Sequence, residues 1–532
     1  MKNLLSKALL PTFVFMGSVL FAQTRVFKEV EGDIKTELKT IRQDNQLVGY
    51  LAFTRLEKAS EDSINYRITI MDENLNDLGV INFKDISLKM QGVSYEGDII
   101  CIAYLRSPVS LENPKIPRED FDFIIQKQKK DIGVFFQFIT LQGKIDNKLM
   151  IPEEIAKFDG ATKKSKKGSV QTSLNKTLQL QNVRDKGFVA YYGNGLSGDN
   201  NLLYFSTDGK KNWQKKLPQF DSYTLQNASS GIHLLASPKP EIVKNNIIFP
   251  TAELLSYSYE KGDASKPLKL KDPKQSDLQV LSYRTNPETG KLNILGLVKN
   301  PEIERYPVTY LQLSKKPYNG LFSMEVNSLE KGGLNTVYTY YDDQKNGAAF
   351  DEKGRIVGDK QRILYDNAYM DGNGVSYFAG TRIKRKPKYG AIGFSVITIP
   401  LIIVPPMIAL FSYTKFQQGD GQVVELKKDG TLSLQNPIPV EKSKYFNPYA
   451  PISLTNPNDF NLAKGISGED YYLISSAANL YIYSTKEDKL KRTIPLKDGK
   501  ESINIFPAKE GYFMVEQYNA KDKTTSLSIE AL

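Results

Sequence analysis

The residue types that carry nucleophilic and metal chemistry are scarce in this sequence. Its 532 residues include one histidine, His233, and one cysteine, Cys101. Ser-His-Asp and Cys-His machinery and the common zinc sites draw on several such side chains, so we expect no catalytic site of these kinds, no metal and no cofactor. Cys101 lies in an apolar run, which predicts a small buried thiol, and His233 lies in an expected strand. A single cysteine excludes an intramolecular disulfide.

Carboxylates are plentiful, but few of them are spaced for joint chemistry. The run from Asp72 to Asp77 alternates acids and amides like the start of a calcium loop. It has Asp77 where an EF-hand needs glycine and Phe83 where it needs an acid, so we expect a polar hairpin turn. Asp342 and Asp343 are adjacent, and adjacent residues of a strand face opposite ways. A carboxylate-dependent carbohydrate hydrolase needs no histidine and stays open as an alternative function.

One segment has the spacing of a known structural turn. Residues 206–213 read Ser-Thr-Asp-Gly-Lys-Lys-Asn-Trp, and Ser206, Asp208 and Trp213 fit the pattern Ser-x-Asp-x-Gly-x-x-Trp. The segment resembles the Asp-box of sialidase-like β-propellers, with Lys210 in the place of the glycine. The resemblance covers eight residues of one unit. It implies a hairpin turn whose carboxylate binds turn amides and whose indole packs beneath, and it does not imply sialidase catalysis.

These residues must be positioned by a chain that repeats one hairpin unit. Aromatic-rich strands and polar turns with Asp, Lys or Gly follow one another from residue 47 to residue 529. The strands are short alternating or continuous apolar runs, and their turns recur every ~40 to 75 residues, near or above the length of a propeller blade. We therefore predict an all-β fold, a β-propeller of about six to eight blades over residues 23–532. Two smaller β-domains are the alternative architecture.

Two pairings follow from this pattern. A first strand at residues 25–30 can join the last blade and remove an exposed sheet edge. Residues 336–341 are expected to pair with residues 348–357 as a further hairpin unit.

The first residues have the pattern of a secretory signal peptide. Two lysines precede an apolar stretch over residues 9–20, and Ala22 is a small residue just before the chain turns polar. We predict a signal peptide over residues 1–22 and an exported protein in the periplasm, cell envelope or extracellular space. A retained membrane anchor is the alternative. The formal charge of +11 becomes +9 on residues 23–532, which favours anionic lipid or acidic glycans over nucleic acid as partners of an exported protein.

An apolar insertion interrupts the strands. Residues 391–411 contain no charged side chain, and five cations lie in the seven residues from Arg382 to Lys388. Three prolines in the run disfavour a membrane-spanning helix. We expect the insertion, residues 384–412, either to touch a membrane surface or partner or to pack on the ring, with a true span as a third alternative. The residues assigned to contact are Lys384, Arg385, Lys386, Lys388, Ile399, Leu401, Ile402, Ile403, Val404, Met407, Ile408, Leu410 and Phe411.

Two further interruptions, residues 107–130 and 152–176, are polar loops by composition. The lack of catalytic signatures, together with one unusual surface element, predicts a non-enzymatic binding or envelope-associated propeller. Its partner would be an unknown protein, glycan or lipid surface. This hypothesis expects a flat or uncharged ring mouth and an exposed apolar loop. The hydrolase alternative expects two or three carboxylates that converge with aromatic residues near the ring axis.

Overall fold

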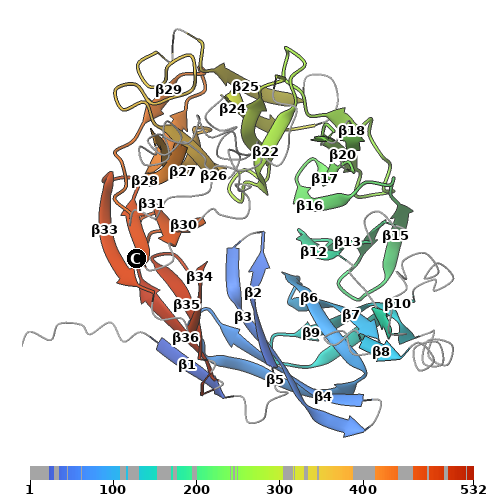
Figure 1. Cartoon of the computed structure of the whole chain (residues 1–532). Helices are drawn as coiled ribbons and strands as arrows, with labels where there is room; N and C mark the ends of the chain where they lie inside the picture. Colours follow the sequence, from blue (N-terminus) through green and yellow to red (C-terminus); the bar gives the residue numbers. More distant parts are fainter. Residues whose placement is uncertain are drawn as a thin grey trace, which may run out of the picture.

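A computed structural model shows the chain as a closed ring of β-sheets around a central axis (Figure 1). Eight four-stranded antiparallel sheets form the blades of this ring in the described residues. The predicted all-β propeller is confirmed with eight blades, and the alternative of two β-domains is wrong. The structure describes residues 23–532 except 29–34, 45, 61–62, 108–114, 118–130, 153–168, 172–176, 194–199, 240, 244–245, 249, 303–315, 317, 329–332, 344, 346, 388–413, 441–458, 476–478, 497–500, 520 and 523.

The blades are numbered here from 1 to 8, and their strands are given from the innermost outward. Blade 1 contains β2 (Lys35–Gln43), β3 (Gln46–Ser60), β4 (Ser63–Asp72) and β5 (Asp77–Asp85); blade 2 contains β6 (Ser87–Glu96), β7 (Ile99–Ser107), β9 (Gly133–Thr140) and β10 (Ile145–Pro152); and blade 3 contains β12 (Thr177–Val183), β13 (Gly187–Gly193), β14 (Asn201–Phe205) and β15 (Lys211–Lys216). Blade 4 contains β16 (Ser222–Ala228), β17 (Gly231–Ser237), β20 (Glu253–Tyr257) and β21 (Leu268–Lys269); blade 5 contains β22 (Leu278–Thr285), β23 (Leu292–Lys299), β24 (Tyr318–Val326) and β25 (Leu334–Tyr340); and blade 6 contains β26 (Arg362–Met370), β27 (Ser376–Pro387), β28 (Thr414–Leu426) and β29 (Leu432–Leu434). Blade 7 contains β30 (Asp459–Lys464), β31 (Asp470–Ser475), β32 (Asn479–Ser484) and β33 (Lys489–Pro495), and blade 8 contains β34 (Glu501–Pro507), β35 (Tyr512–Asn519), β36 (Thr524–Ala531) and β1 (Gln23–Lys28).

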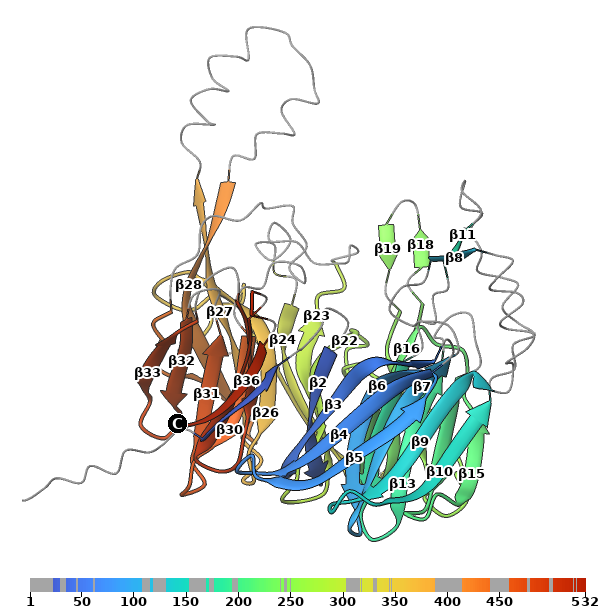
Figure 2. The same ribbon diagram turned by 90° about the horizontal axis from the view of Figure 1, so that it is seen from below.

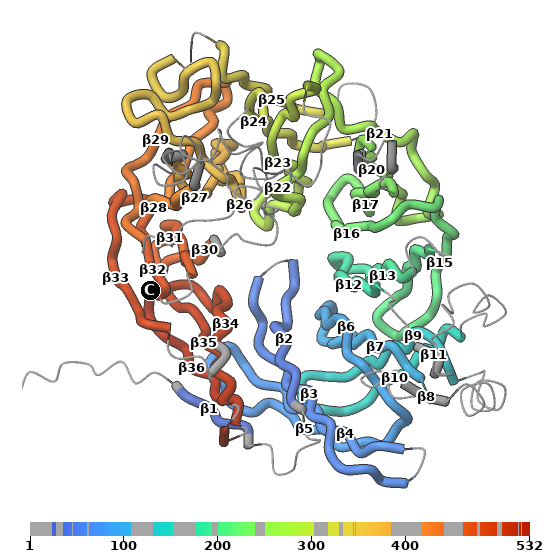
Figure 3. Tube along the Cα trace, viewed as in Figure 1, coloured from blue at the N-terminus to red at the C-terminus, as the bar shows by residue number. Residues whose placement is uncertain are grey.

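The ring is closed by the N-terminal strand. β1 pairs with β36 from Gln23↔Ile529 to Lys28↔Thr524 and so becomes the outermost strand of blade 8. Figure 3 shows β1 beside β36 in this blade. The expectation that a strand near residues 25–30 joins the last blade is confirmed. Arg25 also forms an ion pair of 2.7 Å with Asp77 of blade 1.

In several blades the second strand is buried on both sides because a neighbouring blade covers each face. Every residue of β13 is buried, and so are all residues of β23 except the last. Such strands are continuous apolar runs in the sequence. The outermost strand β15 instead has one buried residue, Trp213, among exposed lysines. Burial from blade to blade therefore accounts for the aromatic-rich strand pattern.

The core is divided into clusters that lie between adjacent blades. Blades 2 and 3 meet through Phe136 and Phe205, whose ring centroids are 4.9 Å apart. Cys101 lies fully buried in this same cluster, and burial raises the pKa of its thiol well above the ordinary value. The expectation of a small buried thiol is confirmed. Each large side chain in such a cluster contributes about 1.5 to 3 kcal/mol of hydrophobic stabilisation.

One face of the ring carries a two-stranded ribbon and two small sheets. Figure 2 shows the ribbon of β27 and β28 rising from this face, together with two small sheets. One small sheet pairs β8 (Lys115–Pro117) with β11 (Ser169–Gln171), so the two polar interruptions meet there. The other pairs β18 (Glu241–Val243) with β19 (Asn246–Ile248). Among the described residues, no helix has the length and apolar character that a membrane span requires.

One predicted pairing is wrong. β25 forms the outer edge of blade 5 by pairing with β24, not with residues 348–357. That later segment makes a single bridge between Phe350 and Ile356. Both side chains are buried in the cluster around blades 5 and 6. The segment has the apolar residues of a strand because its side chains fill a core, although its backbone forms no ladder.

Candidate functional site

A cavity of about 530 Å³ opens at the ring axis against the innermost strands of blades 1 to 5. Its lining comes from β2, β6, β12, β16 and β22, from the turns after β2, β12, β16 and β22, and from Tyr259. Each of these turns is the first turn of its blade, joining the first strand to the second, whereas the β27–β28 ribbon joins a second strand to a third. Because strands within a blade alternate in direction, the first turns lie on the face opposite to the ribbon. A volume of this size is in the range that holds small ligands.

The wall between blades 3 and 4 is joined by glutamine side chains. Gln181 of β12 donates to the carbonyl of Leu225 at 2.9 Å, and its own oxygen accepts from the amide of Asn227 at 2.8 Å. Gln179 makes the same pair of bonds two residues earlier, to Tyr223 and Leu225 of β16. Innermost strands of different blades share no backbone ladder, so these side chains satisfy the exposed strand edge.

A buried asparagine extends this wall toward blades 1 and 2. The Asn182 side chain donates to Glu96 at 2.8 Å and to Asp44 at 3.0 Å. Glu96 is 2% exposed, and its other oxygen accepts from the amide of Asp185 at 2.9 Å. Asn227 in turn donates to the carbonyl of Asn182 at 2.6 Å. The polar groups of the wall are therefore largely bonded to one another, which holds the cavity in one shape.

Cations dominate the charged lining. Lys39, Arg42, Arg184 and Lys186 all line the cavity, and Asp44 is the one carboxylate among the described lining residues. Arg184 lies 2.6 Å from Asp44, and this carboxylate raises the pKa of Arg184 through a hydrogen bond and its charge. The mouth is therefore charged, whereas the binding hypothesis expected a flat or uncharged one.

The cavity cations are held by specific contacts. The Arg42 guanidinium donates to the Thr40 hydroxyl at 3.3 Å and to the carbonyl of Pro507 at 3.4 Å, which fixes its position between blades 1 and 8. The Lys186 ammonium lies 5.0 Å from the centre of the Tyr259 ring, a cation–π contact. Burial lowers the pKa of Arg42 from its usual value.

Further carboxylates lie on the same face, in the turns that follow β22 of blade 5 and β30 of blade 7. Lys464 lies 2.8 Å from Asp470 and 3.9 Å from Glu288. Burial raises the pKa of the Asp470 carboxyl, with smaller opposing effects from Lys464. The buried Tyr472 lies two residues after Asp470 in β31 and so on the same face of the strand. This arrangement meets part of what the hydrolase alternative requires, but these residues do not line the 530 Å³ cavity.

The single histidine is not built for catalysis. His233 is 1% exposed, its Nε2 lies 2.8 Å from the Ser230 hydroxyl, and its Nδ1 contacts Ser256. Burial lowers the pKa of His233 to about 4. A ring with so low a pKa is a weak base near pH 7, and with both nitrogens on serine hydroxyls no carboxylate orients it.

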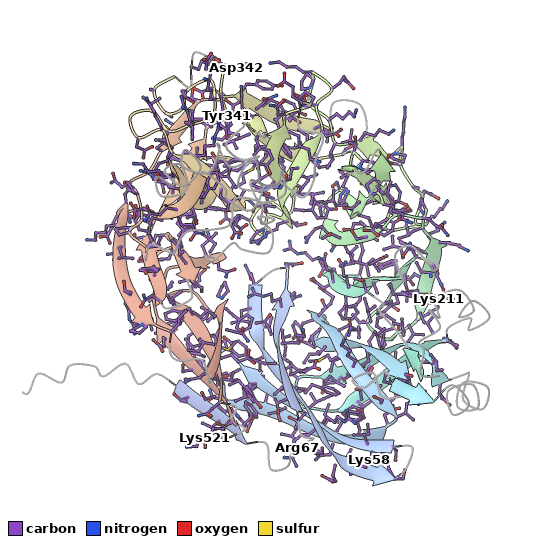
Figure 4. All side chains as sticks on the ribbon, in the orientation of Figure 1. Lys58, Arg67, Lys211, Tyr341, Asp342 and Lys521 are labelled. Atoms are coloured by element: carbon purple, nitrogen blue, oxygen red, sulfur yellow. The ribbon has the colours of Figure 1, made fainter. Side chains whose placement is uncertain are left out.

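The turn at residues 206–213 has the bonding that its sequence suggested. Asp208 accepts from the Ser206 hydroxyl and from the amide of Lys210, the latter at 3.1 Å, and these bonds lower the pKa of Asp208. Trp213 is 9% exposed and donates to the carbonyl of Tyr259 at 2.9 Å. The turn lies at the outer rim near Lys211 (Figure 4). It is structural in its contacts, and the link to Asp-box proteins stays a resemblance.

The other acidic candidates also form turns. One oxygen of Asp72 accepts from the amides of Asn74 and Asn76, both at 2.8 Å, as expected for a polar hairpin turn. No cluster of three or more metal-ligating side chains occurs in the described part of the chain. Asp342 lies at the outer rim of the ring, away from the axis (Figure 4).

The predicted contact residues of the insertion fall largely outside the described residues. Lys384 is described and exposed. Arg385 and Lys386 continue the ladder of β27, which pairs with β28 as far as Pro387↔Thr414. Arg382, at the start of the cationic run, pairs with Asp359 at 3.0 Å and so belongs to the blade. The residues outside the description are Lys388, Ile399, Leu401, Ile402, Ile403, Val404, Met407, Ile408, Leu410 and Phe411.

No sequence motif points to the cavity cations. Lys39, Arg42, Arg184 and Lys186 come from two blades that are far apart in the chain, and nothing in their local sequence sets them apart from surface charges. One available signal was their place at or just after the first strand of a unit. In a propeller that strand lines the axis.

Comparisons with known proteins bear on the fold alone. No protein-family model matches the chain, and no curated protein matches it. The chain is similar to the solved structure of the Dos1 propeller, with a TM-score of 0.44 and 8% identity over 96% of both chains. It is also similar to the WD40 domain of SCAP from fission yeast, with a TM-score of 0.35 and 7% identity over 96% of this chain and 98% of that one. A third similar structure is the dihydro-heme d1 dehydrogenase NirN in complex with DHE, with a TM-score of 0.37 and 12% identity over 90% of this chain and 73% of that one.

Proposed function

We propose that this protein is an exported, non-enzymatic binding propeller that holds its ligand in the axial cavity. The observation that carries this proposal is the bonded wall of the cavity. Gln181 and Asn182 are tied to neighbouring blades by bonds of 2.8 to 3.0 Å. A ligand entering this site meets a preformed shape, which lowers the entropy cost of binding. Export is supported by the pattern of residues 1–22.

The lining favours binding over hydrolysis. Acid–base hydrolysis of a glycoside needs two carboxyl groups on either side of the bond. The described lining offers only Asp44, which is tied to Arg184 at 2.6 Å and to Asn182 at 3.0 Å. A carboxylate held in this way is a structural partner and not a mobile acid or base.

Filling the cavity with a larger side chain tests the proposal. Ser229 lines the cavity, whereas Ser222 is an exposed serine of the same strand-and-turn unit that does not line it. Residues 23–532 would be screened against a panel of glycans and lipids as wild type, Ser229→Phe and Ser222→Phe. We expect at least one ligand whose affinity falls tenfold or more in Ser229→Phe only. If every bound ligand tolerates Ser229→Phe, the axial site is not the binding site. Export is checked by N-terminal sequencing of the protein from the envelope fraction, where a start at Gln23 is expected.

A second function, contact with a membrane surface, is favoured by the ribbon of β27 and β28. This ribbon extends beyond the ring face (Figure 2), and its ladder carries the ends of the insertion to Pro387 and Thr414. The apolar composition of the insertion and its flanking cations suit an interfacial anchor.

The ladder allows a clean removal of the insertion. Because Pro387 and Thr414 are paired, residues 388–413 can be replaced by the two-residue turn Asn-Gly. We expect this variant to fold with an unchanged melting temperature and to lose flotation with anionic vesicles. A variant that unfolds would favour packing of the insertion on the ring. A variant that still floats would remove the membrane proposal.

The alternative function, a carbohydrate hydrolase, would use the carboxylates around Lys464. If it holds, Asp470 with its raised pKa is the acid and Glu288 its partner. Asp470→Asn and Glu288→Gln would then each abolish release of reducing sugar from acidic or neutral polysaccharides. Equal product traces from the wild type, both variants and a blank would exclude this activity on the substrates tested.

A further inference from the structure

The charge of the axial cavity specifies its ligand further than its shape does. Four cations and one carboxylate are among the described lining residues. Asp44 is engaged by Arg184 at 2.6 Å, and the buried Glu96 behind the wall accepts from Asn182. The four lining cations still outnumber these two carboxylates. A cationic concave site concentrates anions, because low-dielectric walls focus the field in the opening.

The remaining polar lining suits hydroxyl groups. Thr40, Ser94 and Ser229 bring hydroxyls to the cavity, and Gln226 brings an amide. The oxygen of Gln226 accepts from the amide of Thr285 at 3.3 Å, which directs its nitrogen as a donor. The apolar lining residues are small or aliphatic, and the aromatic one is Tyr259.

We infer that the axial cavity takes an anionic, hydroxyl-bearing ligand of about disaccharide size, such as a uronate-containing sugar, and that the cavity cations bind its acidic group. This inference rests on the proposed function, because it names the ligand class of the same site. A carboxylate and a phosphate present similar oxygens to Lys and Arg. The probes therefore include a free phosphate arm.

The protein carries its own reporter of the site. Trp213 is the one tryptophan of the chain, and its indole donates to the carbonyl of Tyr259 at 2.9 Å. Tyr259 lines the cavity beside Lys186. A ligand that displaces the lysine from the ring changes the surroundings of Tyr259, and Trp213 fluorescence follows.

The experiment titrates residues 23–532 with digalacturonic acid, its neutral counterpart digalactose, and inorganic phosphate. Calorimetry is the primary measurement and Trp213 fluorescence the second. The variants are Lys39→Gln with Lys186→Gln for the site and, as a control of equal charge change, Lys211→Gln with Lys216→Gln on the outer strand β15. Ser229→Phe again blocks the cavity.

We expect the acidic disaccharide to bind the wild type and the control, with affinity that falls as salt rises. The site variant should lose at least tenfold in affinity, and digalactose should not bind. If the wild type binds phosphate and the site variant does not, the cavity cations form an anion site that phosphate alone can occupy. If digalactose binds as well as the acid and Ser229→Phe removes both, the binding propeller stands and the anionic ligand is wrong. If neither anion binds the wild type, this inference is overturned. That result would overturn the ligand class only. The proposed function would still be tested by the wider ligand panel with Ser229→Phe.

Discussion

Replacing Gln181 with leucine removes two hydrogen bonds that join the innermost strands β12 and β16. The amide side chain donates to Leu225 at 2.9 Å and accepts from Asn227 at 2.8 Å. Each such bond contributes about 1 kcal/mol net, and leucine keeps the side-chain volume. We therefore expect local opening of this edge to become easier by about 2 kcal/mol, which is about 30-fold in exchange rate.

Hydrogen exchange measures this effect without assuming that the whole ring unfolds at once. Exchange at the Asn227 amide is followed by mass spectrometry with fragmentation to single amides. Gln142→Leu, in the exposed turn after β9, is the matched control and should leave Asn227 unchanged. An Asn227 rate in Gln181→Leu within twofold of the wild type would refute the view that glutamine side chains hold these blades together.

Three further outcomes follow from the structure. The pKa of His233 is lowered to about 4 in the folded state against ~6.5 unfolded, so the unfolded chain binds the extra proton as pH falls between these values. Stability should therefore drop by about 2 kcal/mol from pH 7.5 to pH 5 through this residue; titration of the single imidazole signal above pH 5.5 by NMR would contradict this. Cys101 is fully buried with a raised pKa, so native protein at pH 8 should resist iodoacetamide and react only when unfolded; rapid native labelling would mean that the cluster between blades 2 and 3 opens. Deleting residues 23–28 removes the six-residue ladder to β36 and should lower the melting temperature and promote association through the bare edge, whereas Arg25→Gln, which keeps the ladder, should cost less than about 1 kcal/mol; equal melting temperatures for the deletion and the wild type would argue against closure by β1.

The fold was accessible from the sequence because blade-to-blade burial leaves a local trace. Residues 187–192 read as one continuous apolar run, and they became the fully buried β13. The pattern at residues 25–30 allowed closure of the ring, and β1 makes it. Residues 348–357 have the apolar residues of a strand, but Phe350 and Ile356 are buried in a core and form no ladder. Local pattern reports burial but not the partner of a strand.

The site was much less accessible. Lys39 and Lys186 are nearly 150 residues apart in the chain and meet one cavity only after three blades have been stacked in order. Charge on an innermost strand has the same local pattern as charge on an exposed face, so no window of sequence separates the two. The buried pair of Asn182 and Glu96 is hidden for the same reason. The apolar insertion stood out in the sequence because composition alone marks it.

One measurement reaches the central claim directly, that an eight-bladed ring holds a cationic cavity at its axis. Crystals of residues 23–532 soaked in bromide would reveal bound anions by anomalous scattering. We expect a bromide site inside the ring, within reach of Lys39, Arg42 or Lys186, that disappears in the Lys39→Gln, Lys186→Gln variant. Bromide confined to lysines of the outer rim such as Lys211, or an axis without this cavity, would contradict it.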